Sequence, residues 1–252
     1  MTPDPLLAAL VAGLVAAVVG LLVPRVVAAL PEPEPDPEVE PEPEEPQAEP
    51  APVPEPPKAL YVELAARPHL AATCAVVAGS LAAALGVSRG WRPDLPVWIY
   101  LSLLGTTLGY IDWRTRLLPK RLVIPSYFVV AVLLGVASAV DWADGGREAL
   151  IRAGISWVAV FAIHVALWFV YPRGLGYGDV RLSGILGMAL GWLGTDAVLV
   201  GLYAGWVLGA LIAPLLALAK VVNRKEYPFG PFLLVGTFLG VLHADGHLFF
   251  WT

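Results

Sequence analysis

Cysteine is nearly absent from this chain. It occurs once in 252 residues, as Cys74 inside an apolar run. A single cysteine excludes an internal disulfide and a cysteine cage for a metal ion. We interpret Cys74 as a small buried apolar residue. His243 and His247 bracket Asp245 near the C-terminus, but no third ligand accompanies them, so the sequence assigns no metal site.

Charged residues are also scarce: they make up 15% of the chain, whereas 58% is hydrophobic. A chain of this composition cannot hide its apolar surface in one soluble core, which is typical of an integral membrane protein. Nine Trp and eight Tyr suit the interfaces of a membrane. The expected environment is therefore a lipid bilayer, with no nucleic acid as partner.

Basic residues are missing altogether from residues 31–57, which hold twelve Pro and ten acids. Proline removes backbone donors and like charges repel, so we expect an extended, disordered linker. Two interpretations stay open for it, a solvated tether and a docking segment for a basic partner. The rest of the chain carries 16 bases and 11 acids and is mildly basic.

Long apolar runs dominate the remainder. The first, residues 6–23, has no basic residue before it, which favours an uncleaved helix over a signal peptide. Seven more helices are expected at about 69–86, 95–111, 122–140, 151–171, 180–193, 197–219 and from 227–232 to about 242. The predicted fold is all-α and polytopic, with about eight transmembrane helices. Its parts are an N-terminal helix in 1–30, the linker 31–57 and a seven-helix membrane domain in 58–252.

The distribution of bases orients this bundle. With the loop after the third helix inside, inner segments hold twelve bases and outer segments hold four. Because inner loops of membrane proteins are enriched in Lys and Arg, we expect both termini outside and the linker in the cytoplasm. Asp112 and Asp179 then both lie at the cytoplasmic edge.

These two acids each have ordinary explanations. Asp179 opens an apolar helix, where an acid is often a cap. Asp112 precedes four bases and is a candidate ion-pair partner. The other turn acids, Asp141, Asp144, Glu148, Asp196 and Asp245, are interpreted as plain polar residues.

Taken together, the two acids predict chemistry. Two carboxyls held close share one proton, so one serves as a general base for water and the other as an acid. That arrangement is aspartyl proteolysis, which needs no metal. The flanking Gly176 and Gly178, on either side of Tyr177, leave room for an extended substrate.

Two further features are interpreted as structural. Gly184, Gly187 and Gly191 recur along the sixth helix, as residues at close helix contacts do. His164, inside the fifth helix, is expected to bond to a neighbouring helix rather than to relay protons.

Four segments in order resemble prepilin peptidases, the membrane aspartyl peptidases with a GxGD signature. Gly174-Leu-Gly-Tyr-Gly-Asp-Val-Arg-Leu182 is similar to that signature, and Asp112-Trp-Arg-Thr-Arg-Leu-Leu-Pro119 to the family's first-aspartate segment. Tyr227-Pro-Phe-Gly-Pro-Phe232 resembles the late Pro-Phe-Gly-Pro motif, and Leu60-Tyr-Val-Glu-Leu64 the approach to the second helix. The resemblance covers about residues 59–242.

The resemblance implies a specific activity. Family members remove the leader of type IV prepilins or pseudopilins after a Gly, on the cytoplasmic face of the bacterial inner membrane. Asp112 and Asp179 would be the catalytic pair, without a cofactor. Gly176, Tyr177 and Gly178, with Pro228, Phe229, Gly230 and Pro231, would bind substrate or shape the site.

The chain departs from this family in its first cytoplasmic loop. Many members carry two Cys-x-x-Cys pairs there and also N-methylate the product with S-adenosylmethionine. Here that loop is the Pro/Glu linker, so a short form is expected, with S-adenosylmethionine a cofactor only if methylation is retained. Arg181 also stands where a Lys is usual, which keeps the charge.

Two alternatives remain open at this point. One is a presenilin-type protease that cuts inside the bilayer, although Asp112 lies at a helix end beside four bases. The other is a proton-coupled transporter or a membrane scaffold, for which the sequence shows no inverted repeat and no pair of broken helices.

The orientation is open to direct measurement. A reporter fused at residue 45 is expected to read as cytoplasmic, because the linker follows the first helix on the base-rich side. A fusion in the turn near residue 144 provides the opposite control. An external signal at residue 45 would reverse the orientation.

Overall fold

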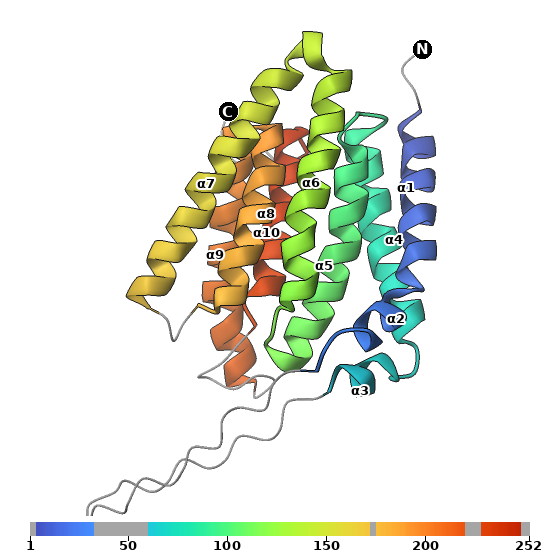
Figure 1. The fold of residues 1–252 in the computed structure, drawn as a ribbon, viewed down its shortest axis with the longest axis vertical. Coiled ribbons are helices and arrows are strands. Elements are labelled where there is room, and N and C mark those ends of the chain that lie inside the picture. The colour runs from blue at the N-terminus through green and yellow to red at the C-terminus, as the bar shows by residue number, and fades with distance from the viewer. Residues whose placement is uncertain (1–3, 33–59, 172–174, 220–227, 248–252) are drawn as a thin grey trace, which may run out of the picture.

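The computed structural model describes residues 4–32, 60–171, 175–219 and 228–247. These residues form a helical bundle, and no strand occurs among them. The elements are α1 (Pro5–Gly20), α2 (Val23–Ala28), α3 (Tyr61–Ala65), α4 (Leu70–Arg89), α5 (Leu95–Thr115), α6 (Lys120–Val140), the 3-10 helix η1 (Trp142–Asp144), α7 (Gly146–Val170), α8 (Tyr177–Leu193), α9 (Thr195–Leu218) and α10 (Gly230–Ala244). Figure 1 shows the longer helices running roughly alongside one another, with α2 and α3 at the lower end.

The helices have membrane character. Four stretches in the described part of the chain are long and apolar enough to cross a bilayer: Leu70–Arg89, Lys120–Val140, Gly146–Val170 and Thr195–Ile212. Helices α1 and α10 are shorter apolar helices. Large apolar side chains stand exposed on the outside of the bundle, such as Phe128 at 75% and Phe169 at 80%. An exposed apolar flank suits lipid rather than water, and the prediction of an all-α membrane protein is confirmed.

Several helix boundaries differ from those predicted. The first apolar run forms two helices. Helix α1 ends at Gly20 and α2 begins at Val23, with Pro24 in the first turn of α2. Helix α5 continues through Asp112 to Thr115, and α8 begins at Tyr177. Both acids therefore lie inside the terminal turn of a helix rather than just outside it.

Close seams of small residues hold pairs of helices together. A Cβ added to Gly86 of α4 would lie 2.6 Å from the Ala9 Cα of α1, and one on Gly236 of α10 would lie 2.7 Å from the Gly205 Cα of α9. Added Cβ atoms on Gly184, Gly187 and Gly191 would come within 2.6 Å of Tyr127, Val160 and Ser156. No side chain fits at such separations, so these glycines serve packing, as predicted.

His164 connects α7 to α9 through a hydrogen bond. Its side chain is fully buried, its Nδ1 lies 2.9 Å from the Val160 carbonyl oxygen, and the Trp206 indole N–H reaches its Nε2 at 3.5 Å. The predicted bond to a neighbouring helix is confirmed.

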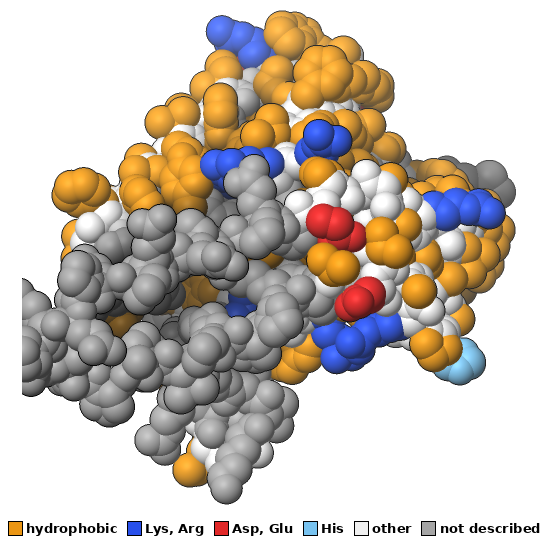
Figure 2. Space-filling view, turned by 60° about the horizontal axis from the view of Figure 1, so that its bottom comes forward, with side chains coloured by type: hydrophobic (Ala, Val, Ile, Leu, Met, Phe, Trp, Pro, Cys, Tyr) orange, Lys and Arg blue, Asp and Glu red, His pale blue; other side chains and the backbone are white. Residues whose placement is uncertain are grey.

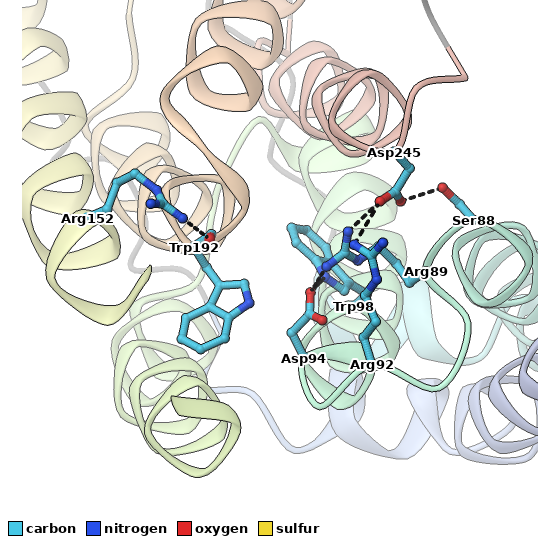
Figure 3. A network of polar contacts seen from close by, with 8 residues as sticks. All are labelled: Ser88, Arg89, Arg92, Asp94, Trp98, Arg152, Trp192 and Asp245. Carbon is cyan, nitrogen blue, oxygen red and sulfur yellow. Dashed lines mark hydrogen bonds and ion pairs between the residues drawn. The ribbon is translucent and has the colours of Figure 1, made fainter. Parts of the chain in front are cut away.

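A buried ionic cluster closes the upper end of the bundle (Figure 3). Arg89, at the end of α4, donates to Asp245 beyond α10 and to Asp94 before α5, the latter at 2.8 Å. Ser88 also donates to Asp245, at 2.5 Å. The interpretation of Asp245 as a plain turn residue was wrong, since its side chain is 2% exposed and joins three helix ends.

A second clamp at the same end binds α7 to α8. The Arg152 guanidinium donates to the carbonyl oxygens of Gly191 and Trp192, at 2.8 and 2.7 Å. Those carbonyls belong to the last turn of α8, where helical partners are missing. The cation therefore satisfies the helix end and suits its dipole.

The lower end carries the short helices and much of the basic charge. The Glu32 carboxylate accepts from the amides of Tyr61 and Val62, at 2.6 and 3.0 Å, and so caps α3. Figure 2 brings this end forward and shows Lys and Arg side chains at several points, with hydrophobic flanks beside them. Apart from Pro31 and Glu32, the predicted linker lies outside the described residues.

Candidate active site

Asp112 lies in the last turn of α5. The helix ends because Arg116 adopts a left-handed backbone, with φ of 56°, and its amide donates to the Asp112 carbonyl oxygen at 2.8 Å. The Asp112 side chain turns into the bundle, and the residue is 4% exposed. A carboxyl so far from solvent needs a donor of its own.

Asp179 is the third residue of α8. The N-cap is Gly176, which has no side chain to offer. A Cβ added at Gly176 would lie 3.0 Å from Asp179 Oδ2, so the carboxyl folds back along the first turn of its own helix. The residue is 7% exposed, and the positive end of the helix dipole lies beside it.

The first residue of α10 brings the two acids together. The Gly230 amide donates to Asp112 Oδ2 at 3.2 Å. A Cβ placed on Gly230 would lie 2.8 Å from that oxygen and 3.4 Å from Asp179 Oδ1. Oxygens of both carboxyls thus lie within 3.4 Å of a single point. Acids 67 positions apart in sequence, on different helices, form one pair.

The two carboxyls of the pair differ in their surroundings. Asp112 accepts a hydrogen bond from the N-terminal amide of α10, which stabilises negative charge. Asp179 Oδ1 is buried, and no donor among the described residues reaches it. Ionising two buried carboxyls this close to each other is unfavourable, because their charges repel. The oxygen without a donor, Asp179 Oδ1, is the one best suited to carry a proton.

The loop after α5 packs against the start of α8, the helix that carries Asp179. A Cβ added to Gly178 would lie 2.8 Å from the Leu118 Cβ, so the first turn of α8 presses directly on this loop. Further along, the Tyr127 hydroxyl of α6 donates to the Arg181 carbonyl oxygen. Gly178 therefore allows close packing of α8 on the loop, and the start of α8 contacts both this loop and α6.

The other predicted site residues lie around the pair with different contacts. The Arg181 guanidinium lies over the Tyr177 ring at 4.4 Å, and the ring packs against Trp168 of α7. Phe229 packs on α9, because a Cβ at Gly209 would come 2.8 Å from its ring. Pro228 is buried, and Pro231 lines a separate groove. Of the seven, Gly176 and Gly230 border the carboxyls.

Sequence reasoning did not single out Leu118 and Tyr127. An aliphatic residue in a loop carries no signal of its own. Tyr127, a phenol inside an apolar helix, was detectable in principle because such a hydroxyl needs a partner.

The described residues contain no group of three or more His, Cys, Asp or Glu positioned to hold a metal ion. Among the described residues, the site offers two carboxyls and the backbone amide at the N-terminus of α10.

Comparison with known proteins identifies a family that the chain resembles in sequence. The model of the type IV leader peptidase family matches residues 98–219, a segment that includes both acids but ends before α10. A prepilin leader peptidase/N-methyltransferase of Escherichia coli K12 is 29% identical over 136 residues, covering 54% of this chain and 57% of the relative. Proteins of the same name from Aeromonas hydrophila and Bacillus subtilis 168 are each 26% identical, covering 66% and 70% of this chain and 55% and 67% of the relatives.

The first of these relatives are longer than the matched region, and the chain spans a little over half of their length. No solved structure matches the chain.

Proposed function

We propose that this chain, whose residues 98–219 match the model of the type IV leader peptidase family, is a member of that family and a membrane aspartyl endopeptidase for prepilin-like precursors. The observation that supports this best is the meeting of two buried carboxyls at Gly230. The proposed substrate is a type IV prepilin or pseudopilin, cut at the cytoplasmic face of the bacterial inner membrane. The proposed chemistry uses Asp112, Asp179 and water, and no metal or other cofactor.

The roles of the two acids follow from their surroundings. Asp112, held by the Gly230 amide, is the charged member and takes a proton from water as the hydroxide attacks the scissile carbonyl carbon. Asp179 is the protonated member and donates a hydrogen bond to the carbonyl oxygen, where negative charge develops. The proton on Asp112 then passes to the leaving amine as the C–N bond breaks. Asp179 keeps its proton throughout, so the pair is again singly ionised, with the charge on Asp112, once the amine has left.

The position of the pair supports cutting at the membrane edge. Asp112 is in the final turn of α5 and Asp179 in the first turn of α8, at the end of the bundle where basic side chains gather. A presenilin-type cut requires the scissile bond deep in the bilayer. A surface cut requires only that a leader reach this end from water.

The decisive substitutions are Asp112→Asn and Asp179→Asn. Each preserves shape but removes a titrating carboxyl, so we expect leader removal to slow by about 100-fold or more. The measurement is cleavage of a precursor with a Gly–hydrophobic junction by protein reconstituted in vesicles. The mass of the product also reports whether its new N-terminus is methylated.

Asp196→Asn is the matched control, since Asp196 is an exposed acid in the first turn of α9, in the helix after α8. It should leave cleavage unchanged. Wild-type rates in either dyad variant, with normal helical content, would rule out the proposed chemistry.

A second variant probes the meeting point itself. Gly230→Ala places a Cβ 2.8 Å from Asp112 Oδ2, which pushes the carboxyl from its position. A misplacement of this size in a catalytic group lowers the rate by about 100-fold. Gly135→Ala on α6, where a Cβ meets nothing within 4 Å, is the control. Equal cleavage rates for these two variants would show that Gly230 does not shape the site.

A further inference from the structure

An apolar groove of about 450 Å³ runs along α5 between α4 and α10. Helix α5 forms its floor, from Trp98 near one end to Trp113 near the other. Fifteen residues of helix correspond to about 22 Å, a large part of the roughly 30 Å hydrocarbon core of a bilayer. The groove is therefore long enough to take a helix across most of the membrane.

The middle of the groove floor carries two glycines. Gly105 and Gly109 lie one turn apart on α5, and a Cβ on either would meet only the Leu234 side chain, at 3.1 and 3.6 Å. A Cβ on Gly86 of the α1–α4 seam or on Gly236 of the α9–α10 seam would instead meet the backbone of a partner helix at less than 3 Å. Paired glycines on a membrane helix allow close approach of another helix. In α5 no described helix makes that approach.

The groove suits an apolar partner. The hydroxyls of Ser102 and Thr106 donate to carbonyls one turn back on α5, at 2.8 and 2.7 Å, and Thr237 does the same on α10 at 2.9 Å. These hydroxyls are thus satisfied within their own helices. The rim is open to the side, because Val77 of α4 and Val235 of α10 are 41% and 49% exposed. A helix can therefore enter from the lipid.

One end of the groove lies next to the carboxyl pair, although the two acids do not line it. Trp113 and Arg114, which line it there, follow Asp112 directly, and Pro231 follows Gly230. At this end Asp179 Oδ1 is 3.4 Å from the position of a Gly230 Cβ and has no donor within the described chain. A ligand in the groove thus ends close to a buried carboxyl oxygen that has no donor in the described chain.

We infer that this groove docks the apolar helix that follows the cleavage site of the substrate, with the helix antiparallel to α5 and its N-terminus at the acids. The inference rests on the proposed function and adds to it the surface that selects the substrate. The close approach at Gly105 and Gly109 sets the depth of the helix, and so places the bond before it at the dyad.

Disulfide trapping tests the occupant. In a Cys74→Ala background, Val235→Cys lines the groove, whereas Val158→Cys on α7 is 60% exposed and lies outside it. Each is combined with Asp112→Asn, reconstituted with a prepilin-type precursor that has one Cys within its apolar helix, and mildly oxidised. We expect enzyme–substrate disulfides with Val235→Cys and none above background with Val158→Cys.

Three outcomes would overturn the docking site. They are equal trapping at both positions, no trapping at Val235→Cys, and disulfides joining two enzyme copies through Val235→Cys in place of substrate. Trapping does not require turnover, so it separates the two proposals: trapping without cleavage by the wild type would refute the peptidase and keep the groove.

Kinetics provide the second measurement. Gly109→Leu fills the floor of the groove and is expected to lower kcat/KM for the precursor by at least about tenfold, because a helix can no longer approach. Cleavage of a short soluble peptide with the same junction but no helix should be unaffected. Gly135→Leu on α6 is the control and should match wild type on both substrates. Equal losses on both substrates in Gly109→Leu would indicate damage to the dyad instead of docking.

Discussion

The arrangement depends on one hydrogen bond between helix ends, from the Gly230 amide of α10 to the Asp112 carboxylate of α5. Burying two acids side by side is unfavourable unless one stays protonated and the other is solvated by protein dipoles. The N-terminus of α10 provides such dipoles, and only glycine leaves space there for both carboxyls. At the opposite end of the bundle, the ionic cluster around Arg89 ties the other ends of α5 and α10 to the end of α4.

Different helices in the bundle perform different tasks. Glycine seams bind α1 to α4, α7 to α8 and α9 to α10 at backbone contact. The glycines of α5 face a groove instead, the surface proposed for a transient helix. A membrane protease of the proposed kind needs both kinds of contact, because its scaffold is permanent and its substrate must leave. The lateral opening beside Val77 and Val235 provides an entry that does not cross the polar end.

The sequence predicted the membrane class, the helical fold and the pairing candidates, because apolar runs and rare acids within them are strong signals. It did not predict that Asp245 is buried, since a turn acid looks the same whether it faces water or Arg89. It also could not predict the convergence on Gly230 or the role of Leu118, because both depend on contacts between segments distant in sequence. The break at Gly20 was missed because composition alone does not show where an apolar run bends.

The central claim is that Asp112 and Asp179 act as one proton-sharing pair, and a double-variant cycle tests it most directly. The rates to compare are those of Asp112→Asn, Asp179→Asn and the double variant on the same precursor. Residues that act as a unit are non-additive, so the double variant should be within about twofold of the slower single variant. A loss in the double variant equal to the product of the two single losses would show that the acids act independently, and would contradict the account.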